Sequence, residues 1–214
     1  MATIVLITGA NRGLGKGLLE RFLKLPNHIV IAANRNPDHP TSKALFKLQT
    51  VEGSKLIVVK VDATVWQDPF DAVESLGSQG IDHIDIVIAN AGVSYIWPFV
   101  ADVKLEDMEV HYRPNVYGYL LKKSNREPIL ANLGSNAGSM SSPLPFPNAA
   151  YGPSKGAAGW YTLKIDMEEP WLNSMAVTPG WVHTELGDAG ALSFGVDEET
   201  KAKMMIGVTS PATA

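Results

Sequence analysis

Residues 3–15 read Thr-Ile-Val-Leu-Ile-Thr-Gly-Ala-Asn-Arg-Gly-Leu-Gly, so an apolar run leads directly into a turn with three glycines. The apolar run, Thr3 to Thr8, is rich in β-branched residues and predicts a strand that is buried on both faces. Beyond the turn, apolar side chains recur at helical spacing until Pro26 ends the pattern. A buried strand, a tight turn and a helix in this order predict the first unit of a parallel α/β sheet.

The glycine turn has the properties of a phosphate-binding loop. Gly9, Gly13 and Gly15 allow the backbone to turn tightly and to approach a ligand closely. The helix that follows points its unpaired N–H groups and the positive end of its dipole at the turn, which favours an anion. The spacing differs from Gly-x-Gly-x-x-Gly, so a tight turn without a ligand stays open as an alternative. No Gly-Lys-Ser/Thr follows, which excludes a P-loop.

The rest of the chain alternates between short apolar runs and helical patterns, which is typical of a doubly wound parallel sheet. Further strands are predicted at residues 28–33, 56–61, 84–89, 129–133 and 174–178, and further helices at 41–49, 69–76, 105–121 (interrupted by Pro114) and 151–168. We therefore predict an α/β fold of the Rossmann type with six strands, in one dinucleotide-binding domain of residues 1–214. Such sheets bind ligands beyond the carboxyl ends of their strands, so we expect substrate loops at residues 93–103, 139–150 and 181–200.

Composition limits the classes of partner. The chain has 214 residues, of which 45% are hydrophobic and 19% charged, so it is long enough to bury one sizeable core. A net charge of −4 without a basic stripe argues against nucleic acid, and no apolar run approaches the ~18 residues of a membrane helix. There are no cysteines and the five histidines are scattered, so no metal site is predicted. The N-terminus lacks a signal-peptide pattern, so we expect a cytoplasmic protein that binds small molecules.

A second stretch, Tyr151-Gly152-Pro153-Ser154-Lys155, carries groups suited to proton transfer. Tyr151 and Lys155 are four residues apart, so a helix places the phenol and the ammonium on one face. A cation at roughly 4–6 Å favours the phenolate and moves the tyrosine pKa from about 10 toward neutrality. Such a tyrosine can act as a general acid or base. Taken alone, the pair is more often an ordinary helix contact.

Further motifs follow in order along the chain. They are Thr8-Gly9-x-x-x-Gly13-x-Gly15, Asn90-Ala91-Gly92, Asn115, a serine before a glycine-rich loop, Tyr151-x-x-x-Lys155 and Pro179-Gly180. In this order and spacing, over residues 3 to about 187, the chain resembles the short-chain dehydrogenase/reductase family. The sequences of its loops, such as Pro-Asn-Ala-Ala-Tyr-Gly-Pro-Ser-Lys, are similar to those of fungal ketoreductases in this family.

The resemblance implies a role for each of four side chains. Tyr151 would donate a proton to a carbonyl oxygen as hydride reaches the carbon, and the Ser135 hydroxyl would hold that oxygen. Lys155 would bind the nicotinamide ribose and lower the tyrosine pKa, and Asn115 would hold a water in the proton path. Ser139 is the alternative to Ser135, because the loop from Ser135 to Tyr151 is about three residues longer than is usual in the family.

The end of the second predicted strand favours NADP(H) over NAD(H). Enzymes that use NAD commonly place a carboxylate there for the ribose 2′-hydroxyl, whereas this strand runs into Asn34-Arg35. Arg12 and Arg35 are the two cations that could bind a 2′-phosphate, although both could also be solvated surface residues. Together with the resemblance, this predicts a cofactor site made of Thr8, Gly9, Asn11, Arg12, Gly13, Leu14, Gly15, Arg35, Asp62, Asn90, Ala91, Gly92, Tyr151, Lys155, Pro179, Gly180, Val182 and Thr184.

Aromatic and apolar residues that follow the predicted strands indicate an apolar pocket. They are Tyr95, Trp97, Met140, Phe146 and Trp181. They suggest an apolar, aromatic or polyketide-derived ketone as the small-molecule substrate. The alternative is that they only anchor their loops.

Two departures from the family leave a second function open. About thirteen residues separate Asn115 from the strand at 129–133, where the family has a longer helix that often packs in a dimer. The sequence also lacks the family's final helix and seventh strand. We therefore expect incomplete burial of Ile88, Leu130 and Leu133, and we leave a homo-oligomer open. An NADPH-dependent ketoreductase is the main interpretation, and a non-catalytic module that senses NADP(H) is the alternative.

Overall fold

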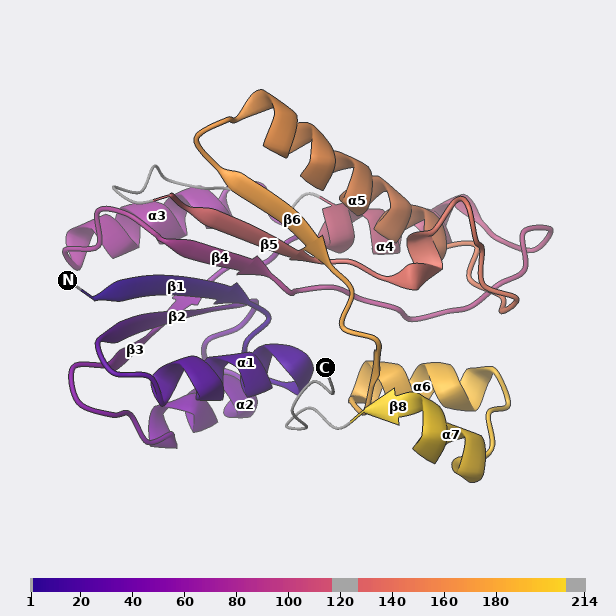
Figure 1. The fold of residues 1–214 in the computed structure, drawn as a ribbon, viewed down its shortest axis with the longest axis horizontal. Helices are drawn as coiled ribbons and strands as arrows, with labels where there is room; N and C mark the ends of the chain where they lie inside the picture. Colours follow the sequence, from indigo (N-terminus) through magenta and orange to yellow (C-terminus); the bar gives the residue numbers. More distant parts are fainter. Residues whose placement is uncertain (1, 117–126, 207–214) are drawn as a thin grey trace.

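Six parallel strands form the central sheet of the computed structural model, which describes residues 2–116 and 127–206 (Figure 1). In sheet order they are β3 (Lys55–Lys60), β2 (His28–Asn34), β1 (Thr3–Thr8), β4 (Ile86–Ala89), β5 (Ile129–Leu133) and β6 (Asn173–Val177). The order reverses between β1 and β4, and in such sheets this switch point opens a crevice beyond the carboxyl ends of the strands. The prediction of a six-stranded Rossmann-type sheet is confirmed.

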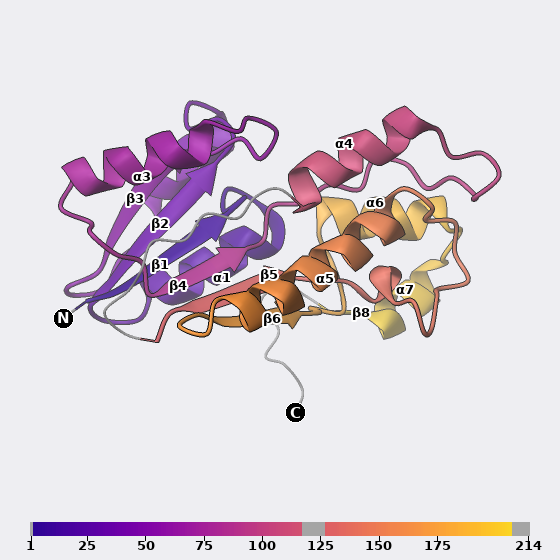
Figure 2. The same cartoon turned by 90° about the horizontal axis from the view of Figure 1, so that it is seen from above.

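Helices cover both faces of this sheet (Figure 2). One face carries α1 (Gly13–Leu23), α2 (Pro40–Lys43) and the 3₁₀ helix η1 (Ala44–Lys47), and the other carries α3 (Asp68–Ser78), α4 (Leu105–Val116) and α5 (Tyr151–Glu168). Each layer buries an apolar core, with Leu19 and Leu23 on the first face and Leu76 on the second. Burial on both faces explains why the strands read as continuous apolar runs.

The sheet is covered where the sequence predicted a gap. Ile88 and Leu133 are 7% exposed and pack in the core with Leu19 of α1, and Leu130 is 0% exposed and packs in the core with Leu76 of α3. The expectation that these three residues are incompletely buried is therefore wrong. Side chains of α1 and α3 pack in the same core clusters as these three residues.

Two predicted helices differ from the observed ones. The helix expected at residues 41–49 is one turn of α-helix followed by one of 3₁₀-helix, and it begins at Pro40 with the His39 ring accepting from the Thr41 N–H at 3.3 Å. Thr41 and Ser42 therefore lie inside this helix, which is capped by His39. Pro114 lies inside α4 and does not interrupt its described part. Residues 117–121 of the predicted helix lie outside the described residues.

The segment expected as a substrate loop at residues 181–200 is mostly regular structure. It contains β7 (Trp181–Val182), α6 (Glu185–Ser193) and the start of α7 (Glu198–Met204), and β7 pairs in parallel with β8 (Met205–Ile206). The Thr184 hydroxyl caps α6 by accepting from Gly187 N–H at 3.0 Å, and Asp197 caps α7 by accepting from Thr200 N–H at 2.8 Å. Each of the two helices therefore begins at a capping side chain. Together these elements form a small unit beyond the carboxyl end of β6 (Figure 1).

Within residues 2–116 and 127–206, no helix combines the length and the apolar character that a membrane crossing needs.

Candidate active site

The glycine turn packs tightly against the chain that follows β4. Gly9 and Gly13 have φ values of +63° and +53°, which side chains other than glycine rarely adopt. A Cβ on Gly9 would lie 3.1 Å from the Cα of Ala91, and a Cβ on Gly15 would overlap the Asn90 amide and the Gly9 carbonyl. The turn therefore requires glycine at these positions, and it leaves the N-terminus of α1 at the switch point between β1 and β4.

Thr8 and Asn90 join this turn to the end of β4. The Thr8 hydroxyl accepts from the N–H groups of Asn90 at 3.0 Å and Ala91 at 2.8 Å, and the Asn90 side chain donates to the Thr8 carbonyl at 2.8 Å. These bonds span more than eighty residues of sequence, since Thr8 ends β1 and Asn90 follows β4. The predicted Asn90-Ala91-Gly92 motif is thus brought beside the predicted glycine turn.

Tyr151 and Lys155 lie on the first turn of α5, where the sequence predicted them. The Lys155 ammonium is 5.9 Å from the centroid of the tyrosine ring and donates to the Leu133 carbonyl at 2.7 Å. Ser135, just beyond β5, is hydrogen-bonded to Tyr151, and its hydroxyl also accepts from the Ala137 N–H at 3.1 Å. The three predicted groups therefore meet at the carboxyl end of β5.

Burial controls the protonation of both groups. It raises the pKa of the Tyr151 phenol above its ordinary value of 10.0, and the hydrogen bond from Ser135 opposes this rise. Burial also lowers the pKa of Lys155 from 10.5 to about 8. The expectation was that Lys155 lowers the pKa of Tyr151. In this structure the pKa is raised overall, and the two causes are burial, which raises it, and the Ser135 hydrogen bond, which lowers it. Tyr151 is therefore a protonated phenol at neutral pH.

Between the two predicted serines, only Ser135 is hydrogen-bonded to Tyr151. The Ser139 hydroxyl accepts from the Ser142 N–H at 3.1 Å, within the loop that leads to α5. This difference places Ser135 and not Ser139 at the phenol.

The Asn115 side chain both accepts and donates hydrogen bonds with the chain that follows β4. Its side-chain oxygen accepts from the Val93 N–H at 2.8 Å, and its amide donates to the Val93 carbonyl at 3.1 Å and to the Ser154 hydroxyl at 3.0 Å. A Cβ on Gly92 would lie 3.1 Å from the Asn115 oxygen and 3.5 Å from the Lys155 ammonium. Gly92 is therefore the point where Asn115 and Lys155 come close together.

The two predicted cations differ in their surroundings. Arg35 is exposed just beyond β2, and it makes no ion pair with the part of the chain that the structure describes. Arg12 forms an ion pair with Glu185 at the start of α6, with both side chains more than half exposed. This pair brings the unit of residues 181–206 against the glycine turn, where the Thr184 methyl would lie 3.4 Å from a Cβ on Gly13.

The other predicted cofactor residues line the same edge of the sheet. The Asp62 carboxylate, after β3, accepts from the Thr64 N–H at 2.9 Å, and the Asn11 side chain donates to the Thr41 hydroxyl at 2.6 Å. Leu14 packs on the core beneath α1, Gly180 turns with a φ of +77° after Pro179, and Val182 is buried. A small cavity at this edge is lined by Thr8, Val61, Ala63, Ala89, Ala91, Pro114, Asn115 and Asn132.

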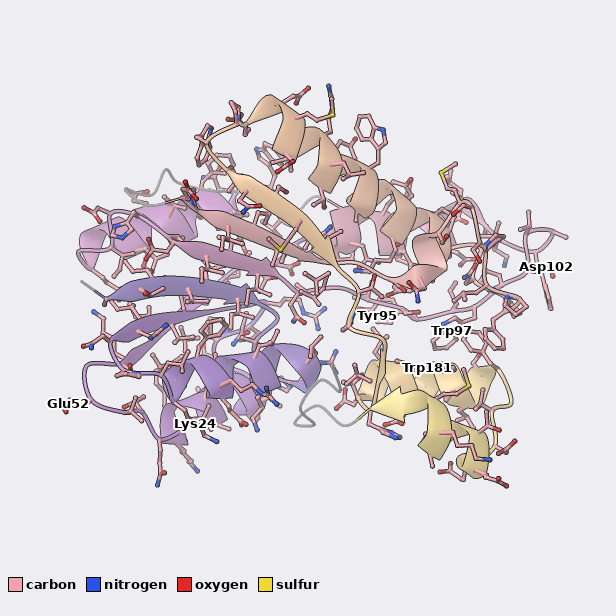
Figure 3. The ribbon with its side chains drawn as sticks, viewed as in Figure 1. Lys24, Glu52, Tyr95, Trp97, Asp102 and Trp181 are labelled. Atoms are coloured by element: carbon pink, nitrogen blue, oxygen red, sulfur yellow. The ribbon has the colours of Figure 1, made fainter. Side chains whose placement is uncertain are left out.

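Three of the five predicted pocket residues meet in one aromatic cluster, which we define as Trp97, Phe146, Trp181 and Phe194. Phe146 and Phe194 stack with centroids 4.8 Å apart, and Trp97 and Trp181 lie 6.0 Å and 6.3 Å from Phe194. In Figure 3 Trp97 and Trp181 lie close together beyond the carboxyl end of the sheet. Met140 is 95% exposed, and Tyr95 instead packs against His111.

Three residues of this region were not predicted. Glu185 had a weak signal, since it directly follows the predicted Thr184, and His111 lies one helical turn before Asn115. Phe194 had no signal, because its partners are up to about a hundred residues away in sequence. Over the described ranges, no group of three His, Asp or Glu side chains could hold a metal ion.

Comparison with known proteins shows the family to which the chain belongs. A family model described as short chain dehydrogenase matches residues 3–190. The chain belongs to this family. The short-chain dehydrogenases are oxidoreductases. A site for oxidation or reduction is therefore expected in this chain.

The chain is also similar to individual members of the family. It is 39% identical to the norsolorinic acid ketoreductase of Dothistroma septosporum over 210 residues, which are 92% of this chain and 78% of that protein. It is 37% identical to the norsolorinic acid ketoreductase of Emericella nidulans, over 92% of this chain and 79% of that protein. The resemblance to fungal ketoreductases is thereby confirmed.

A solved structure gives the same result for the fold. The crystal structure of NADPH-bound carbonyl reductase from chicken fatty liver superposes with a TM-score of 0.81 at 27% identity, covering 97% of this chain and 83% of that one.

The residues of this chain fit a nicotinamide dinucleotide. At Gly9 and Gly15 the glycine turn lies so close to neighbouring atoms that there is no room for a Cβ. The N-terminus of α1, which follows this turn, is suited to bind a pyrophosphate. The end of β2 offers Asn34 and Arg35 and no carboxylate.

Proposed function

We propose that this chain is an NADPH-dependent ketoreductase that reduces an apolar ketone to an alcohol. The observation that carries the proposal is the meeting of Tyr151, Lys155 and Ser135 at the carboxyl end of β5, with the Lys155 ammonium 5.9 Å from the Tyr151 ring centroid; the raised pKa of Tyr151 agrees with it. A phenol that stays protonated at neutral pH is suited to donate a proton to a carbonyl oxygen. We also propose that residues 1–214 act as one dinucleotide-binding domain, since the strands β1 to β6 share one sheet.

The chain's own groups would carry the proton side of the reaction. The cofactor, when bound, supplies the hydride, and Tyr151 transfers its proton to the carbonyl oxygen, so the ketone gains one hydride and one proton. The Ser135 hydroxyl would donate to the same oxygen while negative charge develops on it. Proton return to Tyr151 would pass along Lys155 and Asn115, which approach one another at Gly92.

Charge at the end of β2 supports the preference for NADPH. No carboxylate stands there to accept from a ribose 2′-hydroxyl. Arg35 is exposed and has no ion-pair partner within the described ranges, so its guanidinium is free to bind a 2′-phosphate bidentately. Arg12 could add a second contact, but the phosphate would compete with Glu185 for it.

The aromatic cluster supports an aromatic substrate. It gathers side chains from the predicted loops at 93–103 and 139–150 and from β7 and the end of α6, at the same edge of the sheet as Tyr151. Aromatic side chains bind flat aromatic ligands by stacking and edge contacts. The similar fungal proteins are named for norsolorinic acid, so a polyketide-derived aromatic ketone is the substrate class we propose.

The test is NADPH oxidation with a panel of aromatic and aliphatic ketones, run beside Tyr151→Phe. The variant loses only the proton donor, so turnover should fall at least about a thousandfold while NADPH binding stays within about threefold of wild type. Turnover of the variant within tenfold of wild type would contradict the role of Tyr151. Tight NADPH binding by the wild type without turnover of any ketone would refute the enzyme and select the non-catalytic sensor.

A further inference from the structure

His111 is the histidine in α4 whose side chain is 0% exposed. It lies four residues before Asn115, so the two side chains share one face of the helix. That face is turned toward α5 and the chain after β4, since His111 contacts both Tyr151 and Tyr95. None of the roles assigned above uses this residue.

Both ring nitrogens of His111 are occupied by the backbone. Nδ1 lies 2.6 Å from the Asp107 carbonyl oxygen, and Nε2 lies 3.1 Å from the Tyr95 N–H. A carbonyl can only accept and an amide N–H can only donate, so Nδ1 carries the hydrogen and Nε2 accepts. These bonds hold the imidazole in one tautomer, and no ring nitrogen is left for a substrate or a proton transfer.

The ring of His111 also packs on the proposed proton donor. It meets the Tyr151 ring edge-on at 6.4 Å with an interplanar angle of 70°, and it lies 6.0 Å from the Tyr95 ring. Tyr151 is thus bounded by Ser135 at its hydroxyl, by Lys155 near its ring and by His111 on a further side.

We propose that His111 is a positioning residue for Tyr151, an inference that rests on the proposed function. Asn115 holds Val93 and His111 holds Tyr95, so one face of α4 clamps residues 93–95 at both ends. The clamp keeps the imidazole ring and the loop fixed against Tyr151. Proton transfer depends on the orientation of the phenol, and a displacement of about 1 Å can lower a rate by about a hundredfold.

Two substitutions separate this role from simple space filling. His111→Phe keeps an aromatic ring but has no acceptor for the Tyr95 N–H, whereas His111→Gln keeps an acceptor oxygen at comparable reach. Leu76→Ala is the control for general destabilisation, because Leu76 is 2% exposed on α3 and packs in a core cluster that includes none of His111, Tyr95 and Tyr151.

For His111→Phe we expect kcat to fall by about 10- to 100-fold, with KM for the ketone within about threefold and NADPH affinity unchanged. His111→Gln keeps the acceptor for the Tyr95 N–H but loses the ring on Tyr151, so its kcat should exceed that of His111→Phe by at least about threefold. Leu76→Ala should lower the melting temperature while its kcat below the transition stays within about twofold. A His111→Phe kcat within twofold of wild type would overturn the inference, as would an equal loss of kcat in Leu76→Ala.

Hydrogen–deuterium exchange gives a readout that needs no turnover. The amide of Tyr95 should exchange at least about tenfold faster in His111→Phe than in wild type, and at the wild-type rate in His111→Gln. Unchanged exchange in His111→Phe would refute the clamp even if the enzyme is active. Faster exchange, combined with a wild-type protein that reduces no ketone, would retain the clamp and refute the proposed function instead.

Discussion

Replacing Lys155 with methionine tests how burial acts on the one lysine in the proposed site. Lys155 is 7% exposed, and its ammonium has a hydrogen bond to the Leu133 carbonyl at 2.7 Å. Burial lowers its pKa from 10.5 to about 8. Methionine has a similar length and no charge, so the substitution removes the titration while largely preserving the volume.

The magnitude and the sign follow from linkage. One pKa unit corresponds to about 1.4 kcal/mol, so a pKa change from 10.5 to about 8 amounts to about 3 kcal/mol. The folded-state pKa is the lower one, so the folded protein binds fewer protons between these two values. The destabilisation is fully present below about pH 8 and disappears as the pH rises to 10.5. Lys155→Met lacks this dependence and has instead a constant cost of about 1–3 kcal/mol, because the Leu133 carbonyl loses its donor.

Urea unfolding of both proteins from about pH 7 to about pH 10.5 measures the effect. The two free energies of unfolding should be similar at pH 7, and the wild type should gain about 3 kcal/mol over the variant by the alkaline end. At each pH the free energy of unfolding of the variant is subtracted from that of the wild type, so the contributions of groups that titrate in both proteins cancel. Lys24→Met is the matched control for replacing a lysine by methionine, since Lys24 is exposed on the surface (Figure 3). A difference for Lys155→Met that does not vary with pH would refute the argument from burial.

Three further predictions concern the cofactor site. Arg35→Ala should reduce the difference in binding free energy between NADPH and NADH by roughly 1–3 kcal/mol, which is the scale of a charged hydrogen bond. Calorimetry measures both affinities, and equal affinities of the wild type for the two cofactors would contradict this prediction. Glu185→Gln frees Arg12 from an exposed ion pair, so NADPH should bind about two- to fivefold more tightly, and weaker binding would count against competition for Arg12. Gly15→Ala should abolish the thermal shift caused by NADPH, because the added Cβ overlaps Asn90; a shift of wild-type size would show that the cradle can open.

Local patterns were sufficient for most of the fold. The strand at Ile129–Leu133 and the helix at Tyr151–Glu168 have the predicted bounds, because apolar β-rich runs and helical spacing are properties of neighbouring residues. The glycine turn was also readable, since its φ values above zero require glycine at fixed positions. Sequence reasoning failed at residues 181–200, where the two helices depend on single capping side chains, Thr184 and Asp197.

The sequence by itself determined the sheet, and it predicted which chemical groups stand at the proposed site. The order of its motifs pointed to Tyr151, Lys155, Ser135 and Asn115. The sequence Asn34-Arg35 showed that no carboxylate follows β2 directly. Only the tertiary structure decided how these groups behave. The opposite pKa shifts of Tyr151 and Lys155 arise from desolvation, which depends on every element packed around them. The ion pair of Arg12 with Glu185 joins residues 173 positions apart, and such a contact exists only once the chain has folded.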